Sequence, residues 1–313
     1  MGKGHRTFAP ARPAPSGYGE AQMTKRSIEA VLAPPAPHMV GDGFRVSNFF
    51  PQGYTIPQDR LSPFFLLDYN TPVDFSPREH PRGVGVHPHR GFETVTFAFK
   101  GKVAHHDSAG HSGVIGEGDV QWMTAGSGVL HKEYHEQEFS KTGGPFHMAQ
   151  LWVNLPAKHK MKAPRYQPIK ASDMAVVQLP DGKSEARVIA GELFGVKGPA
   201  KTWSPITAAI VRIGAGGEAS FNLPSGWNST VLMVEGAAII NGSDAPADHL
   251  VLFRNEGEEV HATSKEGATL LVLSGEPLNE PIAAYGPFLM NTYDEIKQAY
   301  ADVAAGKFGV LED

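Results

Sequence analysis

GVGVHPHRGFETVTF, residues 83–97, contains a pair of closely spaced histidines in strand-like sequence. His87 and His89 lie two positions apart within it, and alternate residues of a β-strand point to the same face. We therefore expect both imidazoles to project from one face, about 7 Å apart along the strand, so that they can reach a single metal ion. The glycines around the pair are typical of a strand bounded by turns.

A second stretch repeats this spacing. WMTAGSGVLHKEYHE, residues 122–136, places His131 and Glu133 two positions apart, and a neighbouring strand about 4.8 Å away would bring the two pairs together. The four side chains supply three imidazoles and one carboxylate. Glu93 competes with Glu133, because alternation from residue 87 to residue 93 places it on the face of the histidines. The spacing does not decide which glutamate binds the ion and which lies behind a ligand.

Length and composition indicate an all-β protein of two domains. The 313 residues are enough for two ordinary cores, and 35 glycines and 25 prolines accompany short runs rich in Val, Phe and Leu. One helix is expected near the C-terminus, where Thr292 and Glu295 form a capping box ahead of an apolar stripe.

The two histidine motifs resemble those of the pirin family, whose members are bicupins of the cupin superfamily. HPHRGFETVTF is similar to the first cupin motif, and Thr124-Ala125-Gly126 followed by His131 is similar to the second, with Thr124 where proline is usual. The resemblance covers nearly everything after residue 23, and implies two tandem cupin (double-stranded β-helix, jelly-roll) barrels with a short C-terminal helix. It also favours Glu133 over Glu93, because it implies a metal held by His87, His89, His131 and Glu133.

Changes in composition divide the chain. Residues 1–22 are rich in Pro, Gly and Ala and are predicted to be a disordered leader. A metal-binding first domain is expected over residues 23–155, followed by a linker at 156–170 with three prolines and four lysines. Residues 171–313 form the expected second domain, which has no H-x-H pattern and is predicted to lack a metal.

Charge and cysteine content exclude several classes of protein. The net charge of −5 gives no general attraction to nucleic acids or anionic membranes. Cysteine is absent, which excludes disulfides, thiolate ligands and a cysteine nucleophile. No run of 18 apolar residues or signal peptide is present, so we expect a cytoplasmic protein. A monomer is expected because no feature demands an interface.

Three imidazoles and one carboxylate suit a divalent transition metal, with Fe(II) expected and Cu, Ni, Mn or Zn as alternatives. An octahedral ion with four protein ligands keeps two positions for a chelating substrate and O₂. The resemblance implies quercetin 2,3-dioxygenase activity, in which Glu133 takes the hydroxyl proton of a flavonol and O₂ opens the heterocycle with loss of carbon monoxide. It also implies an alternative, a non-enzymatic, iron-dependent redox sensor that binds a regulatory protein partner. An open apolar pocket beside the ion would favour the enzyme.

Other residues are expected around such a site. Alternation from His89 predicts that Phe97 and Phe99 line the barrel interior, and Trp122 and Met123 are further candidates for the wall of a pocket for a small aromatic substrate. His135 shares the strand face of Glu133, and Gln150 is a weaker pocket candidate. We interpret His105, His106, Asp107 and His111 as polar turn residues rather than a second metal cluster. Metal affinity is expected to fall as the pH drops through and below about 6.5, where free histidine protonates.

Overall fold

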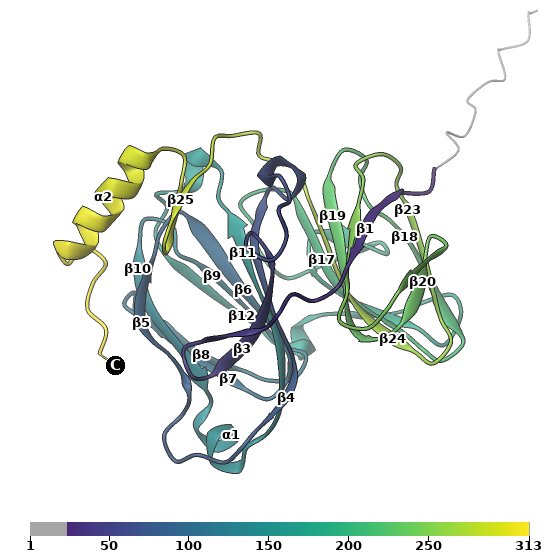
Figure 1. The fold of residues 1–313 in the computed structure, drawn as a ribbon, viewed down its shortest axis with the longest axis horizontal. Helices are drawn as coiled ribbons and strands as arrows, with labels where there is room; N and C mark the ends of the chain where they lie inside the picture. Colours follow the sequence, from purple (N-terminus) through teal and green to yellow (C-terminus); the bar gives the residue numbers. More distant parts are fainter. Residues whose placement is uncertain (1–23, 313) are drawn as a thin grey trace, which may run out of the picture.

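The structure, a computed structural model, describes residues 24–312 and contains two β-barrels that lie side by side (Figure 1). The predicted leader, residues 1–22, lies outside the described residues. The all-β fold is confirmed, since the α-helices within the described part are only α1 (Gln137–Thr142) and α2 (Tyr293–Ala304). No helix among the described residues is long and apolar enough to cross a membrane.

The first barrel consists of two antiparallel sheets. Its seven-stranded sheet contains, in spatial order, β12 (Arg165–Ile169), β9 (Val120–Thr124), β6 (Phe92–Lys100), β11 (Gly144–Asn154), β4 (Phe64–Phe75), β3 (Phe44–Phe50) and β2 (His38–Val40). Its four-stranded sheet contains β5 (Gly83–His89), β10 (Val129–His135), β7 (Val103–Asp107) and β8 (Ser112–Ile115). The expected linker at 156–170 is therefore wrong in part, because β12 pairs with β9 and belongs to the first barrel.

The second barrel repeats this construction. Its seven-stranded sheet contains β1 (Ile28–Leu32), β22 (Leu250–Phe253), β19 (Asn228–Gly236), β24 (Ala268–Gly275), β17 (Ile206–Ile213), β14 (Glu185–Ala190) and β13 (Val176–Gln178). Its four-stranded sheet contains β18 (Gly217–Asn222), β23 (Glu259–Ser264), β20 (Ala238–Ile240) and β21 (Ser243–Ala245). Two short hairpins complete the fold, β15 (Glu192–Leu193) with β16 (Val196–Lys197) and β25 (Ala283–Tyr285) with β26 (Phe288–Met290).

The two seven-stranded sheets pack against each other and bury one continuous hydrophobic cluster. From the first barrel it receives Phe97, Phe99 and Trp122, and from the second it receives side chains such as Ile206 and Leu271. This corrects the expectation that Phe97, Phe99 and Trp122 line the metal pocket. The chain turns at Gly91, with φ +89°, and enters a different sheet, so alternation cannot be counted from His89 into β6.

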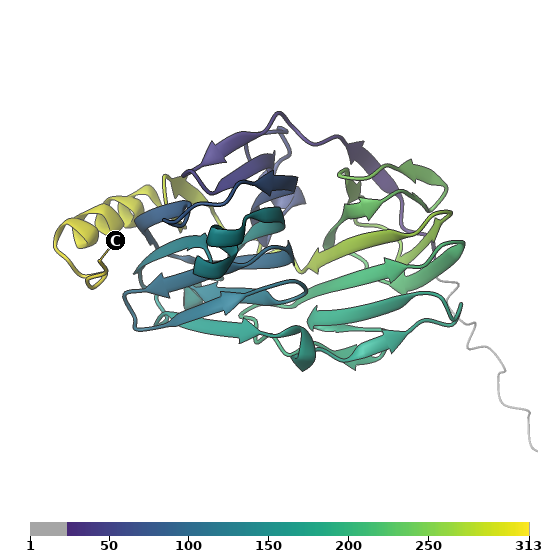
Figure 2. The same cartoon turned by 90° about the horizontal axis from the view of Figure 1, so that it is seen from below.

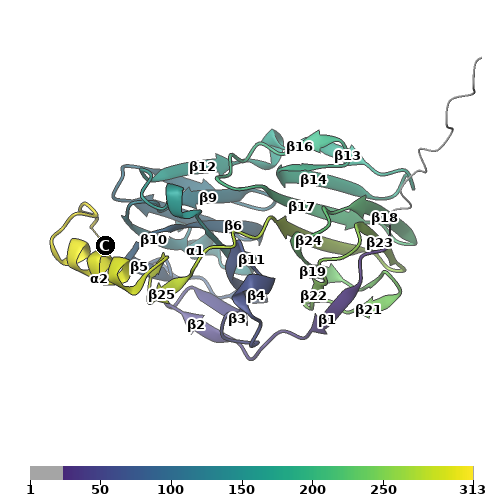
Figure 3. The same ribbon diagram turned by 90° about the horizontal axis from the view of Figure 1, so that it is seen from above.

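Each end of the described chain crosses to the other barrel. β1 pairs with β22 and extends the sheet of the second barrel, whereas β25, β26 and α2 follow that barrel in sequence but pack on the first (Figure 2, Figure 3). The N-terminal segment and the C-terminal segment thus exchange places. The expected domain limits, 23–155 and 171–313, do not describe this exchange, because it depends on contacts that are distant in sequence.

Two buried cations fasten the C-terminal segment to the first barrel. Arg90, which follows β5, forms an ion pair with Asp302 of α2 at 2.9 Å, and its Nε donates to Ser127 O at 2.7 Å. Lys160, only 1% exposed, donates through Nζ to the carbonyl oxygens of Gly91 and Leu289, each at 2.8 Å. These contacts hold the C-terminal segment beside the end of the strand that carries His87 and His89.

Tyr69 of β4 marks the boundary between the barrels. Its hydroxyl lies 2.8 Å from Nε2 of His147, 2.9 Å from Oδ1 of Asp248 and 3.0 Å from the carbonyl oxygen of Val234. His147 is completely buried, and this burial lowers its pKa to about 4. The imidazole is therefore neutral in the folded protein at neutral pH.

Acidification between about pH 6.5 and about pH 4 is expected to destabilise the metal-free protein. In this window His147 is protonated in the unfolded chain but not in the folded one, so unfolding takes up a proton. The neutral His147 side chain contributes about 3 kcal/mol to the free energy of unfolding. This contribution is complete above about pH 6.5 and is lost as the pH falls to about 4. Urea unfolding across this range should show a smaller loss for His147→Gln than for the wild type. Equal losses in the two proteins would contradict the assignment.

Candidate metal centre

Two neighbouring strands, β5 and β10, bring the histidine pairs together. The strands pair antiparallel with His131 opposite His87. The register shifts between His131 and Glu133, so that Glu133 lies opposite Val84. This irregularity moves Glu133 along the sheet relative to the histidines.

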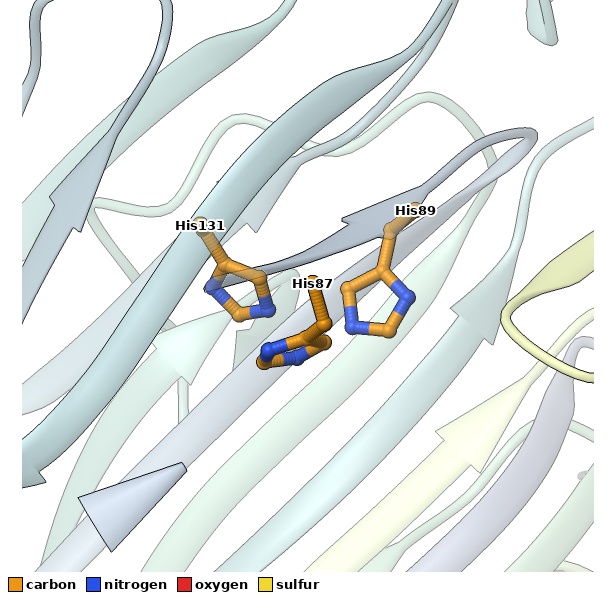
Figure 4. A group of neighbouring side chains, drawn as sticks. All are labelled: His87, His89 and His131. Carbon is orange, nitrogen blue, oxygen red and sulfur yellow. The ribbon is translucent and has the colours of Figure 1, made fainter. Parts of the chain in front are cut away.

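The three imidazoles converge in one small volume (Figure 4). Ring centroids are 4.3 Å apart for His87 and His131, 4.7 Å for His89 and His131, and 4.8 Å for His87 and His89. One ligand atom from each lies within 4.8 Å of the others. Nδ1 of His87 lies 2.8 Å from Gly85 O, and Nδ1 of His89 lies 3.2 Å from Pro287 O.

The free ring atoms fit a bound cation. Because carbonyl oxygens only accept, His87 and His89 each donate from Nδ1 and keep a lone pair on Nε2 for a metal. Nε2 of His131 is buried and has no hydrogen-bond partner. An orphaned nitrogen of this kind is expected where a metal completes the site.

Burial and the proximity of other imidazoles keep His89 and His131 neutral. Burial lowers the pKa of His89 and His131 well below the ordinary value, and the neighbouring imidazoles lower it further. Neutral imidazole is the form that binds a metal. Protons are therefore expected to compete with the metal at these two residues only at a lower pH than the value of about 6.5 for free histidine.

Glu133 lies beside the histidines and is 5% exposed. Its carboxylate accepts hydrogen bonds from Nε2 of Gln121 and Nε2 of Gln150, each at 2.7 Å. With His105 and His131 it forms a second group whose ligand atoms lie within 4.8 Å of one another. His131 belongs to both groups, and the two groups differ in that Glu133 is grouped with His105 rather than with His87 and His89. The sequence alone did not indicate His105 and Gln121 as neighbours of Glu133.

Glu93 is placed elsewhere. It accepts a hydrogen bond from Thr124 Oγ1 at 2.6 Å and lies 3.8 Å from Arg165. Burial raises its pKa to about 7, although the hydrogen bond from Thr124 opposes this. Glu93 and Phe97 lie on the same face of β6, and Phe97 packs against the second barrel. Alternation cannot be counted across Gly91, where the chain enters another sheet. The expected competition between Glu93 and Glu133 for the metal is therefore wrong. Thr124, at the usual proline position, holds this carboxyl.

A cavity of about 310 Å³ opens beside the histidines. His87, His89, Glu133 and Gln150 line it, which supports the expectation for Gln150. Its other lining residues are mostly apolar: Val40, Phe44, Val46, Asp68, Val84, Met148 and Trp152. Met148, Gln150 and Trp152 alternate along β11, so the period of a strand could have identified them together.

Two further candidates lie outside the cavity lining. Met123 packs in a buried cluster with Ala125 and Val129. His135 is buried among aromatic rings, including Phe75 at 4.6 Å and Phe146 at 4.5 Å, and its Nε2 lies 2.8 Å from Gly43 O. Burial lowers its pKa, which suits a neutral core histidine rather than a neighbour of the ligands.

Comparisons with known proteins cover both barrels. Residues 43–153 match the family model described as Pirin, and residues 208–309 match the pirin C-terminal cupin domain. A Pseudomonas aeruginosa protein named after quercetin 2,3-dioxygenase is 47% identical over 271 residues, covering 87% of this chain and 94% of the relative. Human pirin is 38% identical over 255 residues, covering 80% of this chain and 83% of the relative.

Solved structures agree with this assignment. A quercetin 2,3-dioxygenase from Acinetobacter baumannii has a TM-score of 0.87 and 45% identity, and the match covers 92% of this chain and 100% of that one. The barrels of this chain are accordingly cupin barrels, as the resemblance implied. The chain belongs to the pirin family.

Proposed function

We propose that this pirin is a metal-dependent dioxygenase of the quercetin 2,3-dioxygenase type, which uses O₂ to open a flavonol or a similar aromatic chelating substrate. The observation that carries the proposal is the largely apolar cavity whose lining includes His87, His89 and Glu133. Such a cavity lets a flat aromatic substrate reach the residues that would bind the metal. A closed structural metal site would not provide this access. The names of the similar proteins support the same activity.

We assign the metal to His87, His89, His131 and Glu133, with Fe(II) as the native ion. Three neutral imidazoles and a carboxylate match this ion, although Cu, Ni, Mn and Zn accept the same ligands. When bound, the ion supplies Lewis acidity and the redox chemistry that O₂ requires. The second barrel carries no comparable group of ligands among the described residues.

The protein itself positions a general base and provides apolar walls for the substrate. Gln121 and Gln150 each donate to Glu133 at 2.7 Å, which fixes the carboxylate where it can take the hydroxyl proton of the substrate. Phe44, Met148 and Trp152 provide apolar walls for an aromatic ring. Glu133 would therefore serve as both ligand and general base.

Oxygen uptake by Fe(II)-loaded protein supplied with quercetin tests this function. We expect turnover in the wild type and its loss in Glu133→Ala, which lacks the carboxylate that accepts the proton. Asp74→Ala, an exposed position at the end of β4, is the matched control and should retain turnover. A metal-loaded wild type that consumes no oxygen with any flavonol would contradict the enzyme and favour the alternative, an iron-dependent redox sensor with a protein partner.

Asp68 is expected to select ligands by charge. It lines the cavity, its Oδ1 accepts from Nδ2 of Asn48 at 2.7 Å, and burial raises its pKa. An ionised Asp68 favours hydroxyl donors and repels carboxylates. Asp68→Asn should improve binding of a flavone carboxylate relative to 3-hydroxyflavone by at least about tenfold at alkaline pH. Quenching of the protein's tryptophan fluorescence, to which Trp152 in the cavity wall contributes, measures both affinities, and an unchanged ratio would rule out this role.

A further inference from the structure

His105 and Asp107 of β7 lie directly behind the metal ligand His131. β7 pairs with β10, where His105 is opposite Glu133 and Asp107 is opposite His131. His105 is completely buried and Asp107 is 5% exposed, whereas His106 between them is exposed. Their sequence was expected to form a turn, but they alternate on a strand and point into the barrel.

Hydrogen bonds connect these side chains in series. Oδ1 of Asp107 accepts from the backbone N–H groups of Ala109 at 2.9 Å and His111 at 3.0 Å. Oδ2 of Asp107 lies 3.1 Å from Nε2 of His105, and Nδ1 of His105 lies 3.5 Å from Nδ1 of His131. The ring of Tyr166 stacks on His105, with the ring centroids 4.8 Å apart and an angle of 14° between the ring planes. This stacking fixes the plane of the imidazole.

The donors in this series follow from the chemistry of its ends. An ionised carboxylate only accepts, so Nε2 of His105 carries the hydrogen and Nδ1 of His105 carries a lone pair. Nδ1 of His131 must then donate, which leaves the lone pair of His131 on Nε2, the buried atom without a partner. Burial opposes ionisation of Asp107, but hydrogen bonds from His105 and the backbone lower its pKa.

We propose that Asp107 and His105 are positioning residues that fix the tautomer of His131 so that its Nε2 faces the metal. His87 and His89 need no such device, because their Nδ1 atoms face the backbone carbonyls of Gly85 and Pro287. His105 can donate or accept, so only the carboxylate of Asp107 determines its direction. The inference rests on the proposed metal centre and is independent of the dioxygenase reaction.

Asp107→Asn reverses the direction of the hydrogen bonds from residue 107 through His105 to His131, without a change in the shape of the side chain. Two backbone N–H groups require an acceptor at Oδ1, so the amide NH₂ takes the position of Oδ2 and donates to Nε2 of His105. His105 then carries its hydrogen on Nδ1 and donates to His131, whose own hydrogen moves to Nε2. His111, whose Nδ1 lies within 3.2 Å of both oxygens, can donate or accept and does not oppose this orientation.

Two measurements test the proposal. Competition with a chelator should show that Asp107→Asn binds Zn(II) about 10- to 100-fold more weakly than the wild type, the usual effect of losing a partner behind a ligand. Nitrogen-15 NMR of the metal-free proteins should show that the hydrogen of His131 moves from Nδ1 to Nε2. His106→Asn, at the exposed neighbouring position, is the matched control and should match the wild type in both.

A second background separates positioning from structural damage. His105→Phe retains a ring against Tyr166 but removes the connection between Asp107 and His131. In that background, adding Asp107→Asn should change Zn(II) affinity less than about twofold, because the effects of two residues that act through one hydrogen-bond network are not additive. A loss that persists there would show structural damage and overturn the proposal.

The remaining outcomes are also decisive. An unchanged tautomer or unchanged affinity in Asp107→Asn would overturn the positioning role. If His105→Phe lost the metal as completely as His131→Ala, His105 would be a ligand itself, with Glu133, and the proposal would be wrong. A wild type that failed to bind Zn(II) would refute the proposed metal centre, whereas the tautomer measurement would still decide the positioning role.

Discussion

His131→Ala is expected to abolish stoichiometric metal binding at neutral pH. His131 lies 4.3 Å from His87 and 4.7 Å from His89, measured between ring centroids, and belongs to both groups of close ligand atoms. Its loss leaves only two imidazoles and one carboxylate, those of His87, His89 and Glu133, which line the same cavity. Affinity should fall by more than about 100-fold, beyond the usual effect of changes behind a ligand.

Metal content after dialysis and competition with a chelator measure this loss. His80→Ala, an exposed histidine in the segment before β5, controls for the general loss of an imidazole and should bind one metal ion. Circular dichroism of both metal-free variants checks that the barrel is folded. Retention of one ion by His131→Ala with affinity near that of the wild type would place the metal elsewhere.

Arg90→Met is expected to destabilise the protein by about 3 kcal/mol. The guanidinium is buried, pairs with Asp302 at 2.9 Å, donates to Ser127 O at 2.7 Å and lies 4.6 Å from the centre of the Phe308 ring. Methionine keeps much of the apolar stem but leaves both acceptors without their buried donor. Urea unfolding measures the difference in the free energy of unfolding.

Lys307→Met provides a matched control, because Lys307 also pairs with Asp302 but its side chain is 62% exposed. An exposed pair contributes little, so this variant should lose less than about 1 kcal/mol. If the two variants unfolded at the same urea concentration, Arg90 would not be the residue that anchors α2.

The sequence predicted the parts of the site that depend on local geometry. Alternation within a strand places His87 beside His89, and one strand pairing is enough to add His131. Alternation fails across Gly91, where the chain changes sheets, and this error misplaced Glu93 and Phe97. Alternation along β11 also relates Gln150 to Met148 and Trp152, which line the cavity with it.

Other features have no local signal. His105 and Asp107 lie close to Gly110 and Gly113, so a turn was the natural expectation, although β7 extends to Asp107. The expected linker contains three prolines, yet the backbone of residues 165–169 pairs with β9 around Pro168. The crossing of the chain ends depends on pairs such as Arg90 with Asp302, 212 positions apart, which no periodicity can reveal.

The C-terminal segment also has a consequence for the order of events during translation. Pro287, whose carbonyl oxygen faces Nδ1 of His89, leaves the ribosome only after both barrels have been synthesised. A nascent first barrel therefore displays its histidines before the group that orients one of them exists. Stable metal loading is then expected only after residues 283–308 have packed on the first barrel.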